Sequence, residues 1–154
     1  MGLVVIVSLS VFLLDTCVKA FLKQNPLTDF PFIDHVVFIT VVFNEGAAFG
    51  FFNSHTEFLT ILSVVFIGFL ASLVYQERKS SKIVRMAYGF ILGGAFCNLF
   101  DRVVYGYVVD YIDVKVWPVF NLSDSAITLG VLYILYHSLA QRRHEKKVYG
   151  QSGK

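Results

Sequence analysis

Four stretches of this chain are long and apolar enough, or nearly so, to cross a lipid bilayer. A transmembrane helix needs about 20 predominantly apolar residues, and the candidate stretches are residues 1–22, 58–76, 83–100 and 125–141. Hydrophobic residues make up 56% of the 154-residue chain, and charged residues only 16%. A soluble domain of this length could not bury so much apolar surface. We therefore predict a mainly α-helical membrane protein, a single domain over residues 1–154 with four transmembrane helices.

The basic residues predict how the chain is oriented in the membrane. Residues 77–85 and 142–154 contain nine of the 13 Lys and Arg residues but only two of the 11 acidic residues. The positive-inside rule assigns both segments to the cytoplasm. We expect cytoplasmic termini, a cytoplasmic tail at residues 142–154, and connectors 23–57 and 101–124 on the outer side. The net charge of +2 is too small and too unevenly distributed to indicate a nucleic-acid partner.

The two outer connectors contain segments that resemble β-strands. Residues 35–43 (HVVFITVVF) and short runs within residues 105–119 are rich in β-branched and aromatic residues. We predict a small extracytoplasmic β-rich cradle, built from the connector between helices 1 and 2 and the connector between helices 3 and 4. Residues 46–52 (GAAFGFF) are expected to form an apolar element at the membrane interface.

Glycines and cysteines within the predicted helices suggest how those helices pack. Gly89 and Gly93 form a G-x-x-x-G pattern in the third stretch, which favours close helix packing. Cys17 and Cys97 fall toward the outer ends of two helices. Because both lie within spans, we expect buried free thiols in preference to a disulfide.

Polar and ionisable residues gather where the predicted helices meet the outer connectors. Ionisable groups at membrane depth are energetically costly, so they suggest a functional site, although several could simply pair or reach interfacial water. Asp15 and Lys19 lie four residues apart on one helical face, which favours a structural ion pair over direct chemistry. The set comprises Asp15, Lys19, Asn44, Asn98, Asp101, Arg102, Asp110, Asp113, Asn121 and Asp124.

Asp110 and Asp124 are the candidates for acid–base chemistry. Asp110 has apolar neighbours, whereas Asp124 follows Ser123 at the start of the fourth predicted helix, where backbone N–H groups stabilise an anion. Two carboxylates in such different settings can share one proton and activate a water molecule. Spacing alone leaves open the alternative that both are solvated loop residues.

Other chemistries find little support in the sequence. The four histidines lack metal-ligand spacing, and neither an H-E-x-x-H motif nor a phosphate-binding loop is present. We therefore expect neither a metal nor a cofactor. Two rival functions remain open. One is a small transporter or channel whose pathway is lined by Asp15, Lys19 and Asp110. The other is a non-enzymatic scaffold that uses residues 89–94 for helix association.

Three motifs, in this order, resemble those of the lipoprotein signal peptidases, the signal peptidase II family. The resemblance runs through nearly the whole chain, and the spacing of the motifs is similar to that in the family. It implies the same layout of four spans. The motifs are residues 44–49 (NEGAAF), residues 93–102 (GGAFCNLFDR) with residues 106–111 (GYVVDY), and residues 120–125 (FNLSDS).

The resemblance implies an aspartic endopeptidase of the bacterial cytoplasmic (inner) membrane. Such an enzyme removes the signal peptide from diacylglyceryl-modified prolipoproteins by cutting before the lipidated Cys. The site is expected near the outer membrane face, with the substrate entering from the lipid and residues 46–52 closing over it. We expect a monomer, because the site needs only one chain. The family's catalytic pair falls on Asp110 and Asp124, and its supporting residues fall on Asp15, Lys19, Asn44, Gly46, Asn98, Asp101, Arg102 and Asn121.

The chain departs from the family pattern at four positions. Thr16 and Val18 interrupt the family's D-Q-x-[S/T]-K motif. Cys97 stands where the family usually has Gly, and Ser123 stands where it usually has Ala. None of these changes removes a catalytic group, so we expect altered packing or inhibitor fit rather than inactivity.

Overall fold

The computed structural model of the protein describes residues 1–33, 35–46 and 56–151, the last nine by their backbone only. This part of the chain contains four α-helices, a short 3₁₀-helix and a three-stranded sheet. The helices fall where the apolar stretches predict them. They are α1 (Gly2–Gln24), α2 (Thr56–Gln76), α3 (Lys82–Tyr105) and α4 (Leu122–Gln151), with η2 (Glu77–Lys79) between α2 and α3.

Three helical segments in the described residues are long and apolar enough to cross a membrane: Gly2–Gln24, Thr56–Lys79 and Lys82–Tyr105. The fold is therefore of membrane type and mainly helical, as predicted. The helix α4 begins close to the predicted position but continues through residues 142–151, which the sequence analysis assigned to a tail. That segment (RRHEKKVYGQ) contains no proline and mostly favourable helix formers, so nothing in it ends the helix before Gly150.

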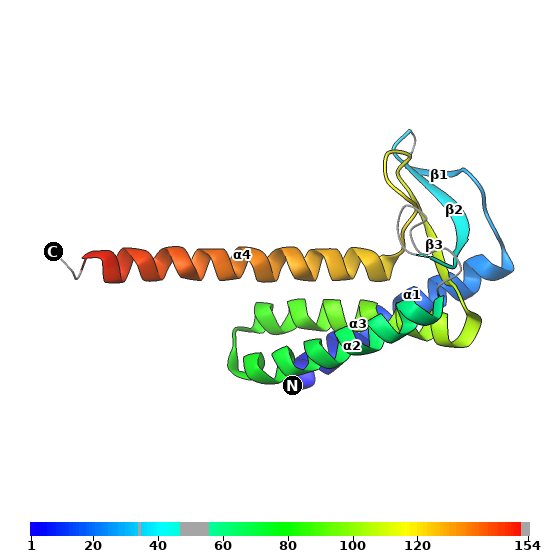
Figure 1. Ribbon diagram of the computed structural model, residues 1–154. Helices are drawn as coiled ribbons and strands as arrows, with labels where there is room; N and C mark the ends of the chain where they lie inside the picture. The colour runs from blue at the N-terminus through cyan, green and yellow to red at the C-terminus, as the bar shows by residue number, and fades with distance from the viewer. Residues whose placement is uncertain (34, 47–55, 152–154) are drawn as a thin grey trace.

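The central element of the helical packing is α3, which contacts α1, α2 and α4. Figure 1 shows the sheet at one end of these helices, with the N-terminus, the turn between α2 and α3 and the far end of α4 toward the opposite end. The same view shows α4 extending beyond the other helices. The polar residues at the sheet end are thereby separated from the basic segments by the length of the apolar helices.

The strands form an antiparallel sheet in the order β1-β2-β3, from β1 (Phe30–Ile33), β2 (Val37–Asn44) and β3 (Val108–Asp113). Strand β3 lies within the second segment predicted to be extended, and β2 lies in the first except for Asn44, one residue past its predicted end. The sequence analysis missed β1, a four-residue strand whose Pro31 is tolerated because the strand lies at the sheet edge. In the pairing of β2 with β3, Val42 lies opposite Asp110 and Asn44 lies opposite Val108, which brings Asn44 close to Asp110.

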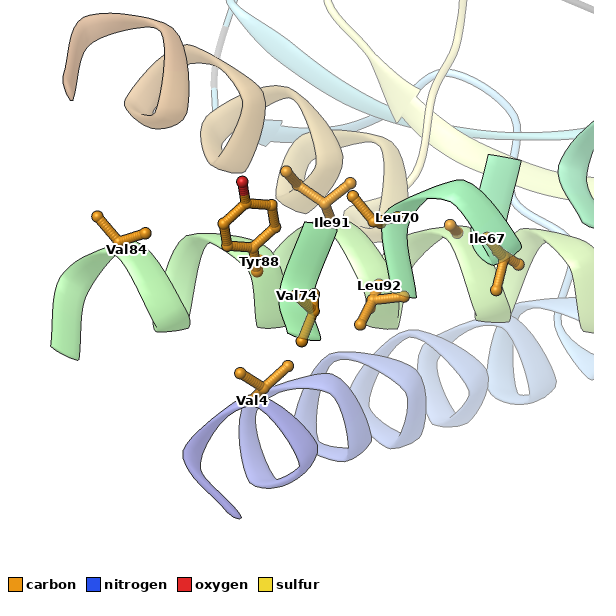
Figure 2. Close-up of a cluster of buried hydrophobic side chains, with 9 residues drawn as sticks. Val4, Ile67, Leu70, Val74, Val84, Tyr88, Ile91 and Leu92 are labelled. Atoms are coloured by element: carbon orange, nitrogen blue, oxygen red, sulfur yellow. The ribbon is translucent and has the colours of Figure 1, made fainter. Parts of the chain in front are cut away.

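Apolar side chains from α1, α2 and α3 form the buried core between these helices (Figure 2). This packing holds α3 in place from Val84 to Ala95, and the C-terminal end of α3 carries several of the polar candidates. Partly buried side chains of α4, including Ile127 and Tyr133, pack against the same core. The core residues are Val4, Ile67, Leu70, Val74, Val84, Tyr88, Ile91, Leu92 and Ala95.

Glycines let α1 and α4 approach the backbone of α3. A Cβ atom added to Gly93 would lie 2.5 Å from the backbone oxygen of Ser8 on α1, and one added to Gly94 would lie 2.4 Å from the backbone oxygen of Ser123 on α4. A Cβ on Gly89 would lie 2.8 Å from the Cβ of Val7. The G-x-x-x-G pattern therefore does pack one helix closely on another, as predicted.

Both cysteines are free thiols, but only Cys97 is buried. The prediction that Cys17 is also buried is wrong. Asp15 and Lys19 lie one helical turn apart on the face of α1 that packs against the rest of the protein. Cys17, midway between them in the sequence, therefore lies on the opposite, exposed face of α1.

Substituting Gly93 tests this close packing. We expect Gly93→Ala to lower the free energy of unfolding by about 1–3 kcal/mol, because the new methyl group overpacks a backbone contact. The matched control is Gly68→Ala on α2, where an added Cβ meets nothing within 4 Å, so its change should stay within about 1 kcal/mol. Thermal unfolding in detergent measures both. Equal effects at the two positions would contradict the packing described here.

Candidate active site

A pocket of about 260 Å³, with both polar and apolar walls, lies where the C-terminal end of α3, the strands β2 and β3 and the start of α4 meet. Asp110 and Asp124 both line it, so the structure brings together the two carboxylates that the sequence analysis singled out. Asp110 is 3% exposed, whereas Asp124 is half-buried. The wall is formed by Asn44, Asn98, Arg102, Val108, Asp110, Trp117, Pro118, Val119, Phe120 and Asp124.

Asp124 is held by the N-terminal cap of α4. The backbone N–H of Asp124 donates to Oδ1 of Asn121 at 2.8 Å, and the backbone N–H of Asn121 donates to Oδ2 of Asp124 at 3.2 Å. This reciprocal arrangement satisfies two N–H groups in the manner of a capping box. It fixes the carboxylate of Asp124 in the first helical turn, where the sequence analysis expected it.

The capping bond also determines what the rest of the Asn121 side chain can do. With Oδ1 engaged at the cap, Nδ2 is directed to Oδ1 of Asp110 at 2.7 Å and to Oδ1 of Asn98 at 3.1 Å. Nδ2 of Asn98 in turn donates to Oδ1 of Asp124 at 2.7 Å. Two asparagine side chains therefore connect the two carboxylates through a continuous set of hydrogen bonds.

A third amide, from Asn44 at the end of β2, holds the other oxygen of Asp110. The backbone N–H of Gly46 donates to Oδ1 of Asn44 at 3.0 Å, which leaves the Nδ2 group to donate to Oδ2 of Asp110 at 2.8 Å. Both oxygens of Asp110 thus accept a bond from an amide whose orientation is fixed elsewhere. Residues 47–52 of the predicted interfacial element lie outside the described residues.

Burial gives Asp110 an unusual affinity for its proton. Removal from water raises the pKa of the Asp110 carboxyl to about 7. The hydrogen bond from Asn44 opposes this rise, the negative charge of Asp124 adds to it, and the bond from Asn121 opposes it. Near neutral pH, Asp110 can therefore both give and take a proton.

A second polar cluster lies beneath the pocket, around the buried ammonium group of Lys19. Its Nζ atom is 2.8 Å from Oδ2 of Asp15 and 2.8 Å from Oδ2 of Asp101. The ion pair between Asp15 and Lys19 is thus present as expected, with Asp101 as a further partner. Nζ also donates to Oδ1 of Asn98 at 3.1 Å, which leaves Nδ2 of Asn98 to face Asp124. The cluster therefore orients Asn98.

Arg102 lies at the pocket wall on the last turns of α3. Its Nη1 group donates to the backbone oxygen of Asn98 through a long bond of 3.4 Å. Its Nε atom is buried and has no hydrogen-bond partner among the described residues. Since Arg102 lines the pocket, its guanidinium group can bind a carbonyl or carboxylate oxygen of a ligand there.

The remaining sequence candidate, Asp113, lies apart from the pocket. Its Oδ2 atom is 3.0 Å from Nζ of Lys115, which also contacts Asp29 at the surface of the sheet. Among the described residues, no group of three or more His, Cys, Asp or Glu side chains is placed to hold a metal ion.

The sequence analysis missed two features of the site. One is the wall formed by residues 117–120, of which 117–119 were assigned to an extended segment and Phe120 was noted only as part of a family motif. The other is the hydroxyl of Tyr111, which donates to Oδ1 of Asp15 at 2.8 Å. The sequence did offer a signal for Tyr111, which is a tyrosine in an apolar predicted strand. A buried tyrosine hydroxyl usually has a hydrogen-bond partner, so a polar contact for Tyr111 could have been predicted.

Comparison with known proteins adds three findings. The family model described as signal peptidase (SPase) II matches residues 7–140. The lipoprotein signal peptidase of Halothermothrix orenii is 43% identical over 137 residues, which cover 87% of this chain and 94% of that protein. The corresponding protein of Caldicellulosiruptor bescii is 38% identical over 144 residues, which cover 91% and 93% of the two chains.

Solved structures agree with the sequence relatives. A bacterial membrane enzyme determined by the in meso method at 2.3 Å resolution has a TM-score of 0.84 and 30% identity, with 95% of this chain and 93% of that chain covered. A second such enzyme, at 1.9 Å, has a TM-score of 0.77 and 30% identity, with coverage of 90% and 94%. The match of the family model over most of the chain, with relatives of this similarity, places the chain in the signal peptidase II family.

Proposed function

We propose that this protein removes the signal peptide from diacylglyceryl-modified bacterial prolipoproteins, cutting before the lipidated Cys, with Asp110 and Asp124 as the catalytic pair. Membership of the signal peptidase II family supports an aspartic peptidase that acts on prolipoproteins. The positions of the two carboxylates support their assignment as the catalytic pair. The two carboxylates line one pocket and are joined through Asn98 and Asn121.

The arrangement suits general acid–base hydrolysis of an amide. A water molecule between the carboxyl groups gives a proton to the ionised one as its oxygen attacks the scissile carbonyl carbon. The protonated carboxyl gives its proton to the carbonyl oxygen, which forms a neutral tetrahedral diol. When the C–N bond breaks, one carboxyl protonates the leaving nitrogen and the other takes the proton of the hydroxyl. The pair as a whole then again holds one proton.

The other pocket residues have supporting roles in this proposal. Asn44, Asn98 and Asn121 keep the carboxylates in place through the bonds described above, and Gly46 orients Asn44. The guanidinium group of Arg102, which lines the pocket, donates to a backbone oxygen of the substrate. Asp15, Lys19 and Asp101 act from beneath the pocket, through Asn98.

A mostly apolar groove of about 460 Å³ runs past Asp124 along the start of α4, lined by Trp117, Phe120, Ser125, Thr128 and Leu129 among others. The groove shares lining residues with the pocket, so it gives the pocket an apolar opening that suits acyl chains. A substrate that carries two acyl chains and a helical signal peptide can reach Asp124 from the bilayer through this groove. We therefore include membrane lipid and a lipid-bearing substrate among the partners of this face.

The proposed topology has four spans, with α4 crossing at residues 125–141, both termini in the cytoplasm and the pocket near the outer face of the inner membrane. The basic segments 77–85 and 142–154 support this orientation. The turn between α2 and α3 and the far end of α4 lie opposite the sheet (Figure 1). We propose a monomer of one domain, since all the pocket residues described come from one chain.

Cleavage of a lipidated substrate tests the function and the catalytic pair together. Purified protein should shorten a diacylglyceryl-modified prolipoprotein, but not its unlipidated form, and a chelator should have no effect. Asp110→Asn and Asp124→Asn should each lower the rate by at least about 1,000-fold, because each removes one member of the acid–base pair. A gel-shift assay on the substrate measures the rate.

The matched control is Asp113→Asn, which removes a carboxylate of the same strand that contacts Lys115 instead of the pocket. This variant should cleave within about 3-fold of the wild type. Cleavage that survives both pocket substitutions would move the catalytic pair elsewhere. A folded wild type that never cleaves would favour the transporter or scaffold alternatives.

Reporter fusions test the topology. Alkaline phosphatase folds only outside the cytoplasm, so a fusion after Val114 should be active, whereas fusions after Ser81 and after Lys154 should be inactive. The expectation follows from the positions of the basic segments. Phosphatase activity in cells, normalised to the amount of each fusion protein, provides the measurement. An active fusion after Lys154 would contradict the proposal that α4 crosses the membrane as a fourth span.

A further inference from the structure

Asp15 of α1 is bonded to both segments that carry the pocket carboxylates. It is fully buried, with 0% of its surface exposed. Its Oδ1 atom accepts a hydrogen bond of 2.8 Å from the hydroxyl of Tyr111, the residue after Asp110. Its Oδ2 atom accepts a hydrogen bond of 2.5 Å from the hydroxyl of Ser123, the residue before Asp124. One carboxylate therefore holds the immediate neighbours of both pocket aspartates.

The bonds to Asp15 are well placed to control the distance between two separate elements. Asp110 lies on β3 and Asp124 on α4, so their spacing depends on how these elements are attached to each other. The hydroxyl of Tyr111 also accepts a bond of 3.2 Å from the backbone N–H of Leu122, the first residue of α4. Tyr111 thus contacts α4 as well as α1, and it fixes β3 against both.

The surroundings of Asp15 make it a firm anchor. Nζ of Lys19 lies 2.8 Å from Oδ2, and the thiol of Cys97 donates to the same oxygen at 3.3 Å. Hydrogen bonds to an ionised carboxylate are shorter and stronger than those between neutral groups. Neither Tyr111 nor Ser123 lines the pocket. Neighbouring side chains on a strand point to opposite faces, so Tyr111 faces away from the pocket when Asp110 faces it.

We propose that Tyr111 and Ser123 are positioning residues for the reaction, which act through Asp15 to hold Asp110 and Asp124 at the spacing at which the two carboxyls share a proton. The inference rests on the proposed function and adds two residues that do not touch the reacting atoms. It also gives a role to Ser123, one of the positions at which this chain departs from the family pattern.

The variants Tyr111→Phe and Ser123→Ala each delete one hydroxyl from the full-length enzyme. We expect each to lower kcat by about 10-fold, because a small displacement of catalytic groups is enough to slow the reaction. KM should stay within about 2-fold, since the pocket wall is unchanged. The bell-shaped pH profile of kcat should become narrower, because carboxyls that move apart interact less and titrate closer together.

The double variant separates a shared anchor from two unrelated effects. If Asp15 must hold both segments at once, releasing the second segment adds little to the loss. The kcat of the double variant should then be close to that of the single variant with the lower kcat. Independent effects at distant sites would multiply instead. Controls are Tyr88→Phe, a buried tyrosine in the helical core (Figure 2), and Ser8→Ala, whose hydroxyl donates to the backbone oxygen of Gly89. Both controls should keep the kcat and pH profile of the wild type.

Several outcomes would overturn the proposal. These are an unchanged kcat and pH profile in both single variants, a multiplicative loss in the double variant, or equal losses in the controls. Failure of both single variants to fold, with the controls folded, would also overturn it, because the Asp15 bonds would then serve stability instead of spacing. The wild type and Asp110→Asn, assayed in parallel, report separately on the proposed function.

Discussion

The site depends on the contacts of the buried ammonium group of Lys19. This group forms ion pairs with Asp15 and Asp101 at 2.8 Å each and donates to Asn98, so it joins α1 to the C-terminal end of α3. Removal of one member of a buried ionic cluster leaves an uncompensated charge and costs about 3–5 kcal/mol. Asn98, a member of this cluster, donates to Asp124. Asp15 accepts hydrogen bonds from Tyr111 and Ser123, the chain neighbours of the two pocket aspartates. The stability of the helix pair and the geometry of the pocket therefore have one origin.

The architecture explains how a pocket with polar groups forms at one end of a set of apolar helices. The helices pack closely at glycines of α3, and the pocket forms at the end of the helices that carries the sheet (Figure 1). There, each amide of the pocket has one end fixed by another group, by the cap of α4, by Gly46 or by Lys19. Amides fixed in this way hold the carboxylates in place before a substrate binds, and in the proposed reaction they provide electrostatic preorganisation.

Much of the fold follows from the sequence, because apolar length and residue type act locally. The apolar stretches predicted the helices, and the β-branched runs predicted β2 and β3. The bond from Tyr111 to Asp15 could not be predicted, because it joins residues 96 positions apart and depends on how three elements dock. By contrast, the sequence contained the signals for two features that were predicted wrongly. Helical periodicity turns Cys17 away from the face that carries Asp15 and Lys19, and residues 142–149 contain no signal that ends α4.

The central claim is that Asp110 and Asp124 together hold one proton near neutral pH. Infrared titration of protonated carboxyl groups in the purified protein, over a pH range centred on about 7, measures this proton directly. We predict a carboxyl band in the wild type that disappears as the pH rises through about 7, is absent from Asp110→Asn, and is kept in Asp113→Asn. A wild type with no band that titrates near neutral pH, or the same band in Asp110→Asn, would contradict it.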